Sequence, residues 1–519
     1  MRLTKLICSL VLSAALSFSA AAESVRVVTD KSVYVAGDLI WCSAFCMEGE
    51  SLSNASAVAY VELISADGIA ATAKIALISG RGCGVISLPA TIPTGNYLLF
   101  AYTSASDVAE GEIVTVFNTM SGVRVKKGVE LCGDALPEPE GGLSVNGPVK
   151  VTSESVDGKT ILHLQGTSGS DVTAAVSVYE EDGLRAPEAA PVAMALTAGE
   201  VEKDGEIIRA SVYGKDSGKL LDSPWLTAVI SAPGSAADTY MGKIDGDGVI
   251  TFKTNNIYGD RDLVCEILAL DNETLDCHFS PIDPFVLPEH PAIPSLRLSS
   301  SMRDALTARH LALKSSVKVD TLYEFLPKRD NLLLSSADAV SYHLDDYTRF
   351  DTVEDIIIEL IPQVSVHRVR GRRQFRMGVE DYAEHGRSLN VLAMLDGVPV
   401  SNHEHLLGFD AYALSDVIVY PYMYALGNTV FSGVINFVTT RKDMSALRFN
   451  NNVRIVDFRG CSYPVTLKTP DYSETLPAGR TLYWQPLITI PAGAQVDIEV
   501  PGTDASRSIR VFGYSAGIK

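Results

Sequence analysis

Apolar stretches long enough to cross a bilayer as a helix are missing from this chain, since such a crossing needs about 20 residues. The nearest approach is the run Leu6–Leu16, which follows Arg2 and Lys5 and precedes three alanines at positions 20–22. A basic start, a short apolar run and small residues are typical of a secretory signal peptide. We therefore expect residues 1–22 to be a cleaved signal peptide, the protein to be exported, and the mature chain to have no transmembrane helix.

Positive charge is also scarce. The chain has 43 Lys and Arg residues against 63 Asp and Glu residues, which gives a formal net charge of −20. A general nucleic-acid-binding protein needs a cationic surface to displace counterions from phosphates. The acidic balance therefore excludes nucleic acid as a general partner and favours solubility in an extracytoplasmic space.

Cysteine is sparse, with eight residues, of which Cys8 lies in the expected signal peptide. The mature chain then holds an odd number, so at least one thiol is unpaired or is paired with another chain. Cys265 and Cys277 flank a predicted hairpin turn around Asp271 and are the best candidates for a disulfide.

Three further cysteines lie in the N-terminal strands. Cys42 and Cys46 are four residues apart on one strand, about 13 Å, which is too far for them to bridge each other. Two alternatives remain open: a disulfide from either one to Cys83 on a neighbouring strand, or three buried free thiols.

Patterns that would support catalysis are incomplete. Gly513–Gly517 matches Gly-x-Ser-x-Gly, but the acid and the histidine of a hydrolase follow the serine in chain order, and only two residues remain. His403-Glu404-His405 has the alternation of a metal pair on a strand, yet no third ligand is identifiable, and a polar loop is the preferred interpretation. Asp245–Gly248 indicates a hairpin turn and lacks the ligands of a calcium loop. We expect no catalytic, cofactor-binding or metal-binding residues, and no enzyme.

Valine, isoleucine, threonine and tyrosine are abundant, in short runs between glycine-containing turns. Such runs predict a mainly β, multidomain architecture, and the length predicts about three to five domains. Two stretches read as connectors by composition: Leu136–Gly142, and a segment with five prolines between Pro281 and Pro294. Ser300–Ser315 then has a helical apolar stripe.

The first mature strands contain Thr29-Asp30-Lys31, then Tyr34, then Gly37-Asp38. This opening resembles the start of macroglobulin-like domains, and the resemblance covers residues 24 to about 118. It implies a macroglobulin-like β-sandwich over residues 23–120. The reactive thioester of that family is excluded, because Gly82-Cys83-Gly84 is followed by Val85-Ile86 where the motif needs Glu-Gln. Residues 140–282 are expected to form one or two immunoglobulin-like sandwiches, followed by a Pro-rich linker and helix over residues 283–345.

Three short apolar strands follow at residues 391–440. The motif of this segment consists of six residues at turns and near the starts of strands: Asp396, Gly397, Val398, Pro399, Gly433 and Asn436. The segment resembles the plug domain of TonB-dependent outer-membrane receptors, which implies a small α/β plug-like domain over residues 346–442. A large barrel needs about 22 strands of roughly 10 residues, whereas residues 443–519 are expected to form only a short C-terminal β unit. We find no TonB box, so the sequence predicts a plug-like module without a pore.

A short helix opens this module. Asp351 with Glu354, or Thr352 with Asp355, supplies a capping box, and Pro362 ends the helix. A predicted hairpin follows, with Gly371 at its turn, and it gathers the basic residues Arg368, Arg370, Arg372, Arg373 and Arg376. These arginines either protect a solvated strand edge from aggregation or dock an anionic partner.

The order of these parts resembles a family of exported Bacteroidetes proteins that combine a macroglobulin-like domain with a plug-like domain and have no barrel. The resemblance implies a non-catalytic binding or scaffold protein of the cell envelope, periplasmic or associated with the outer membrane. It would have protein partners, a β-barrel receptor among the candidates, and no cofactor. Two alternatives are an accessory component of TonB-dependent nutrient uptake, and a surface adhesin or macroglobulin-like protein that interacts with proteases.

Overall fold

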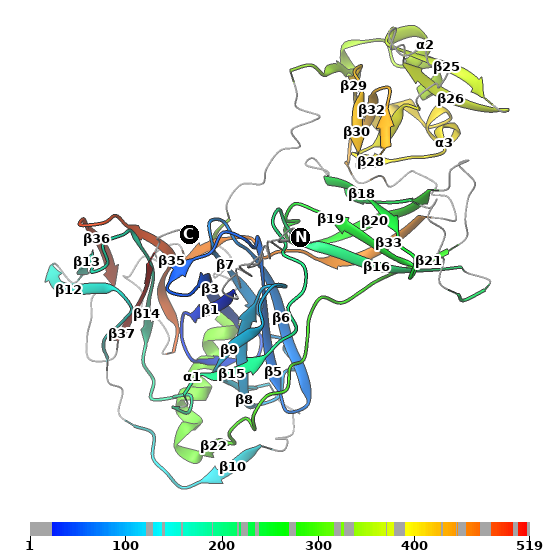
Figure 1. Ribbon diagram of the computed structural model, residues 1–519. Coiled ribbons are helices and arrows are strands. Elements are labelled where there is room, and N and C mark those ends of the chain that lie inside the picture. Colours follow the sequence, from blue (N-terminus) through cyan, green and yellow to red (C-terminus); the bar gives the residue numbers. More distant parts are fainter. Residues whose placement is uncertain are drawn as a thin grey trace, which may run out of the picture.

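The computed structural model describes residues 23–120, 128–137, 141–156, 159–188, 190–214, 217–219, 227–233, 238–268, 277–315, 323–325, 337–369, 371–377, 390–426, 429–442, 444, 453–467, 479–501 and 507–515. These residues form two β-sandwiches, a seven-stranded sheet and a smaller module of strands and helices (Figure 1). The predicted mainly β, multidomain fold class is confirmed. Within the described ranges, no helix has the length and apolar character needed to cross a membrane.

The first sandwich has two sheets that enclose one apolar core. One sheet contains β1 (Ser24–Thr29), β3 (Leu39–Glu48), β4 (Ser51–Leu52) and β7 (Arg81–Ser87), and the other contains β2 (Val33–Val35), β5 (Val58–Ser65), β6 (Gly68–Ala76), β8 (Gly95–Tyr102), β9 (Val108–Phe117) and, from later in the chain, β15 (Val192–Ala195). Val25, Ile40, Leu63 and Leu99 are among the fully buried residues between the sheets.

Strand β3 is buried on both faces, which explains its unbroken apolar sequence. Because neighbouring strand residues point to opposite sides, the even-numbered residues 40–46 face the core of the first sandwich. Trp41 and Phe45 face the other way, into a second apolar cluster shared with later strands. There the Phe45 ring stacks on Tyr514, with 4.3 Å between ring centroids. The outer face of the sheet that contains β3 therefore packs against the second sandwich.

The second sandwich is assembled from two distant parts of the chain. One sheet has the order β11 (Gly142–Asn146), β37 (Arg507–Ser515), β14 (Val172–Glu180) and β35 (Thr481–Ile490), and the other has the order β12 (Val149–Val156), β13 (Lys159–Gly166) and β36 (Gln495–Pro501). The C-terminal strands were expected to form a β unit of their own. Instead they complete sheets begun more than 300 residues earlier, because only these strands supply partners for β14 on both sides.

The seven-stranded sheet is assembled in the same way. Its order is β21 (Cys277–Pro281), β16 (Ile207–Gly214), β19 (Val249–Lys253), β18 (Asp238–Ile244), β17 (Thr227–Ala232), β20 (Asp260–Leu268) and β33 (Val453–Arg459). The predicted hairpin turn at Asp245–Gly248 joins β18 to β19, and Asp245 Oδ1 accepts hydrogen bonds from the backbone of Asp247 and Val249, both at 2.9 Å. The strands of residues 140–282, expected to form one or two sandwiches, are thus divided among the first sandwich (β15), the second sandwich and the seven-stranded sheet.

These pairings give the chain a nested path. It builds part of the second sandwich and most of the seven-stranded sheet, enters the small module, and then returns through the sheet and the second sandwich in reverse order. In Figure 1 the orange strand β33 lies at the edge of a sheet of green strands, and the red strands β36 and β37 lie beside the cyan β12 and β13. Contacts between residues this far apart in sequence carry a large loop-closure entropy and slow folding.

The Pro-rich segment lies along the first sandwich. Phe285 packs edge-on against Tyr60, with 5.8 Å between ring centroids, and Asn96 Nδ2 donates to the Pro294 carbonyl at 3.0 Å. Beyond it, β22 (Leu296–Ser299) pairs with β10 (Val129–Cys132), and a 3-10 turn (Ser300–Met302) leads into α1 (Arg303–Ser315). Met302 and Leu306 pack against the sandwich as their predicted stripe requires. The side chain of Leu313 lies outside the described residues.

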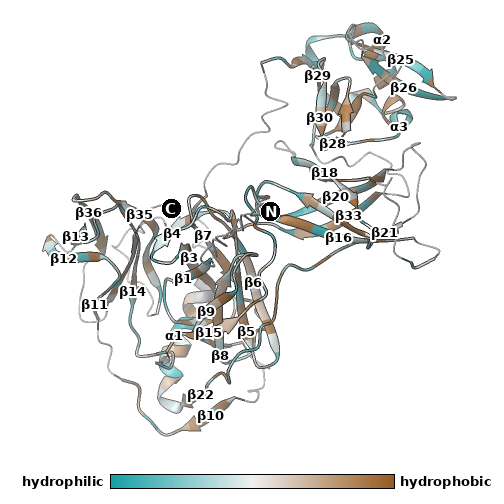
Figure 2. Ribbon diagram, viewed as in Figure 1, coloured by the Kyte–Doolittle hydropathy of each residue, from teal (hydrophilic) through white to brown (hydrophobic). Residues whose placement is uncertain are grey.

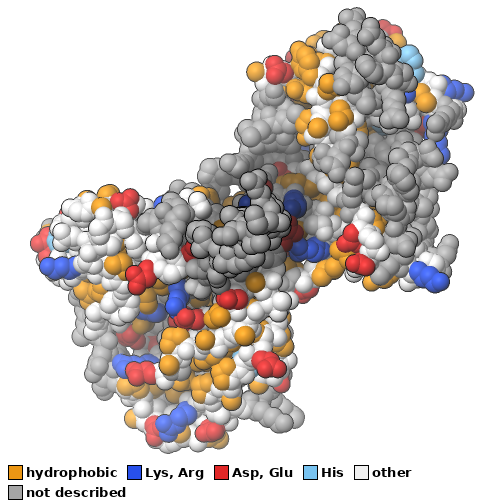
Figure 3. All heavy atoms as spheres, viewed as in Figure 1, with side chains coloured by type: hydrophobic (Ala, Val, Ile, Leu, Met, Phe, Trp, Pro, Cys, Tyr) orange, Lys and Arg blue, Asp and Glu red, His pale blue; other side chains and the backbone are white. Residues whose placement is uncertain are grey.

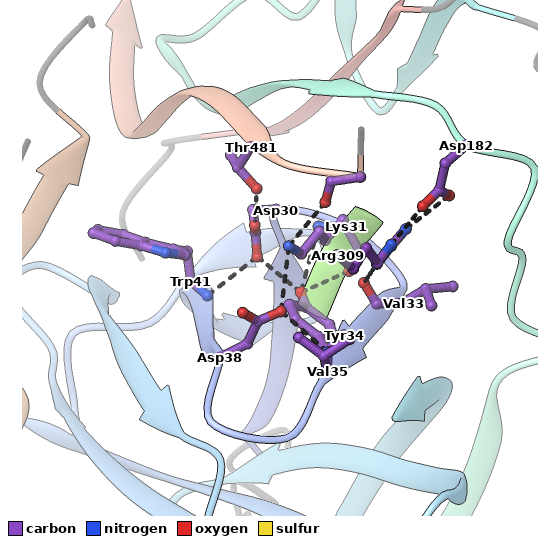
Figure 4. Close-up of polar contacts among 11 residues, drawn as sticks. Asp30, Lys31, Val33, Tyr34, Val35, Asp38, Trp41, Asp182, Arg309 and Thr481 are labelled. Carbon is purple, nitrogen blue, oxygen red and sulfur yellow. Dashed lines mark hydrogen bonds and ion pairs between the residues drawn. The ribbon is translucent and has the colours of Figure 1, made fainter. Parts of the chain in front are cut away.

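A buried polar cluster explains the motif in the first strands (Figure 4). Asp30 accepts hydrogen bonds from the Trp41 backbone at 3.1 Å, from the Tyr34 hydroxyl at 2.8 Å and from the Thr481 hydroxyl. Lys31 Nζ lies 3.6 Å from Asp38 Oδ2 and donates to a backbone carbonyl in the returning segment. The motif residues therefore hold the segment that leads into β35, and the cluster joins the first sandwich to the second.

An ion pair beside this cluster fixes α1. Arg309 donates through Nε and Nη2 to the two carboxylate oxygens of Asp182, at 2.5 and 2.9 Å, and through Nη1 to the Val33 carbonyl at 2.7 Å. The side chains of Arg309 and Asp182 are only 7% and 4% exposed. Gly479 allows this approach, since a Cβ atom there would lie 2.3 Å from Arg309 Nε. The helix, the second sandwich and the returning segment meet at this pair.

Removing one partner of the buried pair should destabilise the protein strongly. We expect Asp182→Ala to lower the free energy of unfolding by about 3–5 kcal/mol, because Arg309 would stay buried without its counter-ion. The matched control is Asp134→Ala, since the Asp134–Arg297 pair is 60% and 65% exposed and should contribute about 1 kcal/mol or less. Urea unfolding followed by tryptophan fluorescence measures both, because Trp41 and Trp484 are buried at the sandwich interface. Equal effects of the two changes would contradict the prediction.

Glu62 carries a buried carboxylate in the first sandwich. Its Oε1 accepts hydrogen bonds from the Tyr102 hydroxyl at 2.6 Å and from the Val286 backbone at 2.9 Å, whereas its Oε2 has no partner among the described residues. Burial raises the pKa of this carboxyl group above its usual range, and only the two hydrogen bonds oppose the shift. The protonated acid is therefore favoured in the folded state relative to the unfolded chain.

The pH dependence of stability follows from that direction. A raised folded-state pKa means that the folded protein binds more protons, so the stabilisation is complete below about pH 4.3, the ordinary pKa of glutamate, and is lost as the pH rises through the folded value. We expect Glu62→Gln, which mimics the protonated acid, to flatten this loss, so that the variant gains stability over the wild type as the pH rises. Urea unfolding at pH 5 and pH 8 measures the difference; an identical slope in both proteins would rule it out.

Candidate functional site

The distal module, residues 340–444, is built on a five-stranded mixed sheet. The sheet order is β24 (Val340–His343), β29 (Leu414–Tyr420), β32 (Val434–Thr439), β27 (Leu392–Leu395) and β28 (Val398–Pro399); the other elements are a 3-10 turn (Leu344–Asp346), α2 (Val353–Leu360), β25 (Val364–Val369), β26 (Arg372–Met377), α3 (His403–Leu407), a second 3-10 turn (Ala411–Ala413), β30 (Tyr424–Leu426) and β31 (Thr429–Phe431). In Figure 1 the module lies next to the seven-stranded sheet and away from the two sandwiches.

The Asp-Gly-Val-Pro segment forms a tight turn between β27 and β28. Asp396 and Gly397 both have positive φ, 50° and 80°, as a two-residue hairpin turn of this kind requires. The Asp396 carboxylate is buried and accepts from the Thr439 backbone at 2.7 Å, the Thr439 hydroxyl at 2.6 Å and the Met444 backbone at 3.1 Å. Val398 pairs across the turn with Leu395. The aspartate thus ties the turn to the end of β32.

The other residues of the motif lie at the turn or, in the case of Gly433, at the opposite end of β32. Asn436 Oδ1 accepts from the Gly397 backbone at 2.8 Å. A Cβ atom on Gly433 would lie 2.3 Å from Met377 Sδ, so glycine permits the close approach of β26. Pro399 pairs with Met394 on the short edge strand β28. Five of the six motif residues meet at the turn, whereas Gly433 lies at the opposite end of β32, beside the pair Leu392–Val434.

Helix α2 begins with the second of the two expected capping boxes. The Thr352 hydroxyl accepts from the Asp355 backbone, and the Asp355 carboxylate accepts from the Thr352 backbone. The helix ends at Leu360, before Pro362, as predicted. Ile356 and Ile357 are buried in the module core, whereas Ile358 is 66% exposed. Three consecutive isoleucines cannot all face one core on a helix with 3.6 residues per turn, so one of them must point outward.

The basic residues of the β25–β26 hairpin are divided between its two faces. Residue 368 pairs with residue 373, so Arg368 and Arg373 share the face of Val366 and Phe375, toward α2. Arg372 and Arg376 lie on the opposite face by strand alternation, and Arg370 is outside the described residues. The four described arginines of the predicted basic hairpin therefore do not form one patch. In Figure 2 much of the hairpin is teal, that is, hydrophilic.

Arg373 is already engaged within the module. Its guanidinium makes an ion pair with Glu354 on α2 and lies 4.0 Å from Glu404 on α3, and its backbone nitrogen donates to Glu404 at 3.2 Å. This arginine therefore anchors the hairpin to both helices. Arg368, by contrast, is exposed and makes no ion pair with any described residue.

A groove of about 490 Å³ lies between α2 and β25 on the surface of the module. Its apolar surface comes from both sides and is formed by Ile357, Ile358, Ile361, Pro362, Val364 and Val366. Ser365, His367, Arg368, Arg373 and Glu354 add polar and charged groups. In Figure 3, orange apolar, blue basic and pale blue histidine side chains occur at this end of the module. The sequence analysis predicted one wall of the groove, the basic hairpin. It missed the other wall, α2, for which the three consecutive isoleucines at positions 356–358 were the available signal.

His403-Glu404-His405 forms the start of α3 and not a strand or a loop. His403 is buried, and its Nδ1 accepts from the Phe375 backbone at 3.1 Å. Burial, and to a smaller extent Arg376, lower the pKa of His403 to about 4, so the ring is neutral at physiological pH. No group of three or more metal-binding side chains occurs among the described residues. His403 and Glu404 hold the hairpin in place.

The proposed disulfide partners are not brought together. Cys265 is a buried free thiol on β20, and four strands of the sheet order separate β20 from β21, on which Cys277 lies. The hairpin turn expected between them falls outside the described residues. Cys42, Cys46 and Cys83 are buried free thiols as well, which was one of the two open alternatives.

The module contacts the seven-stranded sheet through a few specific groups. Thr239 donates to the Gly397 carbonyl at 2.9 Å, and Ser401 donates to the buried carboxylate of Glu266. Met241 packs against Met394 and Tyr424 of the module. The turn that organises the module therefore also attaches it, and the groove between α2 and β25 lies elsewhere on the module.

No protein-family model and no curated protein matches the chain. Among solved structures, similarity is found to a Salmonella α2-macroglobulin mutant (8% identity, 96% of this chain and 39% of that chain, TM-score 0.22) and to trypsin-activated α2-macroglobulin from Escherichia coli (8% identity, 96% and 41%, TM-score 0.23). A third similarity is to the Yersinia pseudotuberculosis adhesin InvE (11% identity, 50% and 60%, TM-score 0.12). The chain spans about two fifths of the two α2-macroglobulins. TM-scores this low support neither a domain assignment nor a function.

The Asp-Gly turn should be critical for the module. We expect Asp396→Ala to destabilise it by about 2–3 kcal/mol, because three hydrogen-bond donors lose a charged acceptor in a buried site. Asp410→Ala is the matched control, since Asp410 caps only an exposed turn through the Tyr412 backbone. Hydrogen exchange of the β27, β29 and β32 amides in the full-length chain measures the effect. Unchanged protection in Asp396→Ala would contradict it.

Proposed function

We propose that this protein is a non-catalytic binding protein of the cell envelope, and that the distal module is the part that contacts its partner. The observation that carries the proposal is the groove between α2 and β25. It combines an exposed isoleucine, further aliphatic side chains and an arginine that makes no ion pair with any described residue. Exposed apolar area beside charged groups is typical of surfaces that bind other proteins.

The rest of the chain supports this role as a scaffold. The two sandwiches share a buried interface, and the Lys74–Glu206 ion pair, 2.6 Å long and almost fully buried, joins the first sandwich to the segment that enters the seven-stranded sheet. The Lys74 ammonium also lies 4.4 Å from the Phe458 ring centroid on β33. These contacts would hold the sheet that carries the module in a fixed position, so that the groove is presented away from the sandwiches.

A role in TonB-dependent nutrient uptake is the second candidate. It is favoured by the turn and strand motif at Asp396–Pro399 and Gly433–Asn436, which forms one compact unit here. In this version the partner would be a separate β-barrel receptor in the outer membrane. The two versions share the module as the contact region and differ in the identity of the partner.

Capture from envelope fractions tests the proposal. The full-length tagged chain is expressed with its own N-terminal segment in its native host, cross-linked, and recovered with its partners. We expect Ile358→Asp to reduce recovery of a specific envelope protein at least tenfold, because the charge would be placed in the apolar surface of the groove.

The matched control is Ile455→Asp, the same change at an isoleucine on β33 that is 57% exposed. It should leave recovery unchanged. The proposal fails if no envelope protein is enriched over a tag-only control, or if both variants recover the wild-type partner equally. Identification of a β-barrel receptor as that partner would select the uptake role.

A further inference from the structure

The strand that lines the groove has an open edge. β25 forms a two-stranded sheet with β26 and pairs with no other described strand. The connection between Val369 and Arg372 is two residues long, and in such hairpins the closing pair is hydrogen-bonded and the pairs alternate. Val369, His367 and Ser365 therefore direct their backbone groups toward β26, and Val366 and Arg368 direct theirs away from it.

The groove runs along this edge. The consecutive residues Val364–Arg368 all line it, although their side chains alternate between the two faces of the strand. The side chains of one face account for Val364, Val366 and Arg368, so the lining by Ser365 and His367 indicates that the groove also reaches the open edge. The opposite wall is helix α2, which contributes Ile357 and Ile358. A helix beside an open strand edge is a geometry that binds extended peptides, because main-chain hydrogen bonds form along the strand and alternate side chains enter the groove.

Charge selects the kind of peptide. Arg373 is neutralised by Glu354 and Glu404, as described above. Arg368 is left as the cation of the groove without an ion pair among the described residues, and it lies on the same face of the hairpin as the aliphatic surface. An arginine at a strand edge also discourages indiscriminate pairing between edges. A segment that offers a carboxylate to Arg368 would satisfy that charge.

We propose that β25 accepts an extended, acidic and aliphatic peptide segment of a partner protein as an added β-strand. The added strand pairs with the backbone of Val366 and Arg368, places an aliphatic side chain against Ile357 and Ile358, and places an Asp or Glu carboxylate against Arg368. About five peptide residues fit along the edge, given the rise of roughly 3.3 Å per residue in a strand. This inference rests on the proposed function and specifies how its partner is recognised.

Selection from a phage-displayed random dodecapeptide library on the immobilised full-length protein tests the inference. The expected sequences carry aliphatic residues at alternate positions and an Asp or Glu beside them. Arg368→Glu should weaken binding of a selected synthetic peptide at least tenfold, measured by fluorescence anisotropy. The matched control is Arg372→Glu, the same charge change on the other face of the same hairpin, which should change binding less than twofold.

Backbone pairing is tested separately from charge. Val366→Pro removes one open N–H that would donate to the added strand, so it should abolish peptide binding. The hairpin itself should still form, because proline is tolerated on a strand edge whose N–H makes no ladder bond. If that variant does not fold, as judged by circular dichroism, methylation of alternate amide nitrogens in the selected peptide replaces it. One of the two methylation patterns should prevent binding and the other should not.

In the peptide experiments, the inference is overturned by a selection without a shared motif, by wild-type binding of Arg368→Glu, or by equal binding of both methylated peptides. Vesicles of phosphatidylglycerol serve as a further probe. If wild type binds them and Arg368→Glu and Arg372→Glu lose that binding equally, the hairpin docks to anionic surfaces and strand addition is rejected. If envelope partners are captured by wild type and equally by Arg368→Glu and Val366→Pro, the proposed function survives and strand addition fails; if wild type captures none, the proposed function itself fails.

Discussion

The fold depends on strand β14 obtaining its hydrogen-bonding partners from the far end of the chain. Its residues from Val172 to Val178 are all buried, and its two neighbours in the sheet are β35 and β37. Buried backbone groups without partners cost about as much as lost hydrogen bonds, so β14 is stable only after residues 481–515 have returned. In the same way, β20 obtains the hydrogen-bonding partners of one of its edges only when β33 returns. In sequence the module lies between β20 and β33, two strands that pair with each other.

Buried polar side chains connect the parts of the fold that come from distant segments of the chain. Asp30 receives the Thr481 hydroxyl, Arg309 pairs with Asp182, and Lys74 pairs with Glu206. Each contact links segments more than 120 residues apart. Buried ion pairs contribute little net stability compared with apolar contacts of the same size, but a mispaired one is costly. Because these ion pairs connect distant segments, a wrong pairing of the sheets would leave buried charges without partners. The apolar cores between the sheets provide most of the favourable free energy.

The distal module repeats this division of roles on a smaller scale. Its buried polar residues, Asp396, Asn436 and His403, are used to fix turns and the hairpin. The groups left over, Ile358 and Arg368, face the groove and have no structural partner among the described residues. That contrast locates the candidate binding surface better than the count of arginines does, because a charge that is already paired is not available to a ligand.

Local patterns determined much of this protein directly. Short apolar runs predicted the mainly β fold, the capping box predicted the start of α2, and the Asp-Gly pair predicted the turn after β27, since each depends on residues within a few positions. Only the tertiary structure decided which strands share a sheet, that Cys265 stays unpaired, that the C-terminal strands complete the second sandwich, and that Arg373 faces two carboxylates. Those outcomes depend on strand pairing between distant segments, where many partners satisfy the same alternation and only simultaneous burial of both faces selects one.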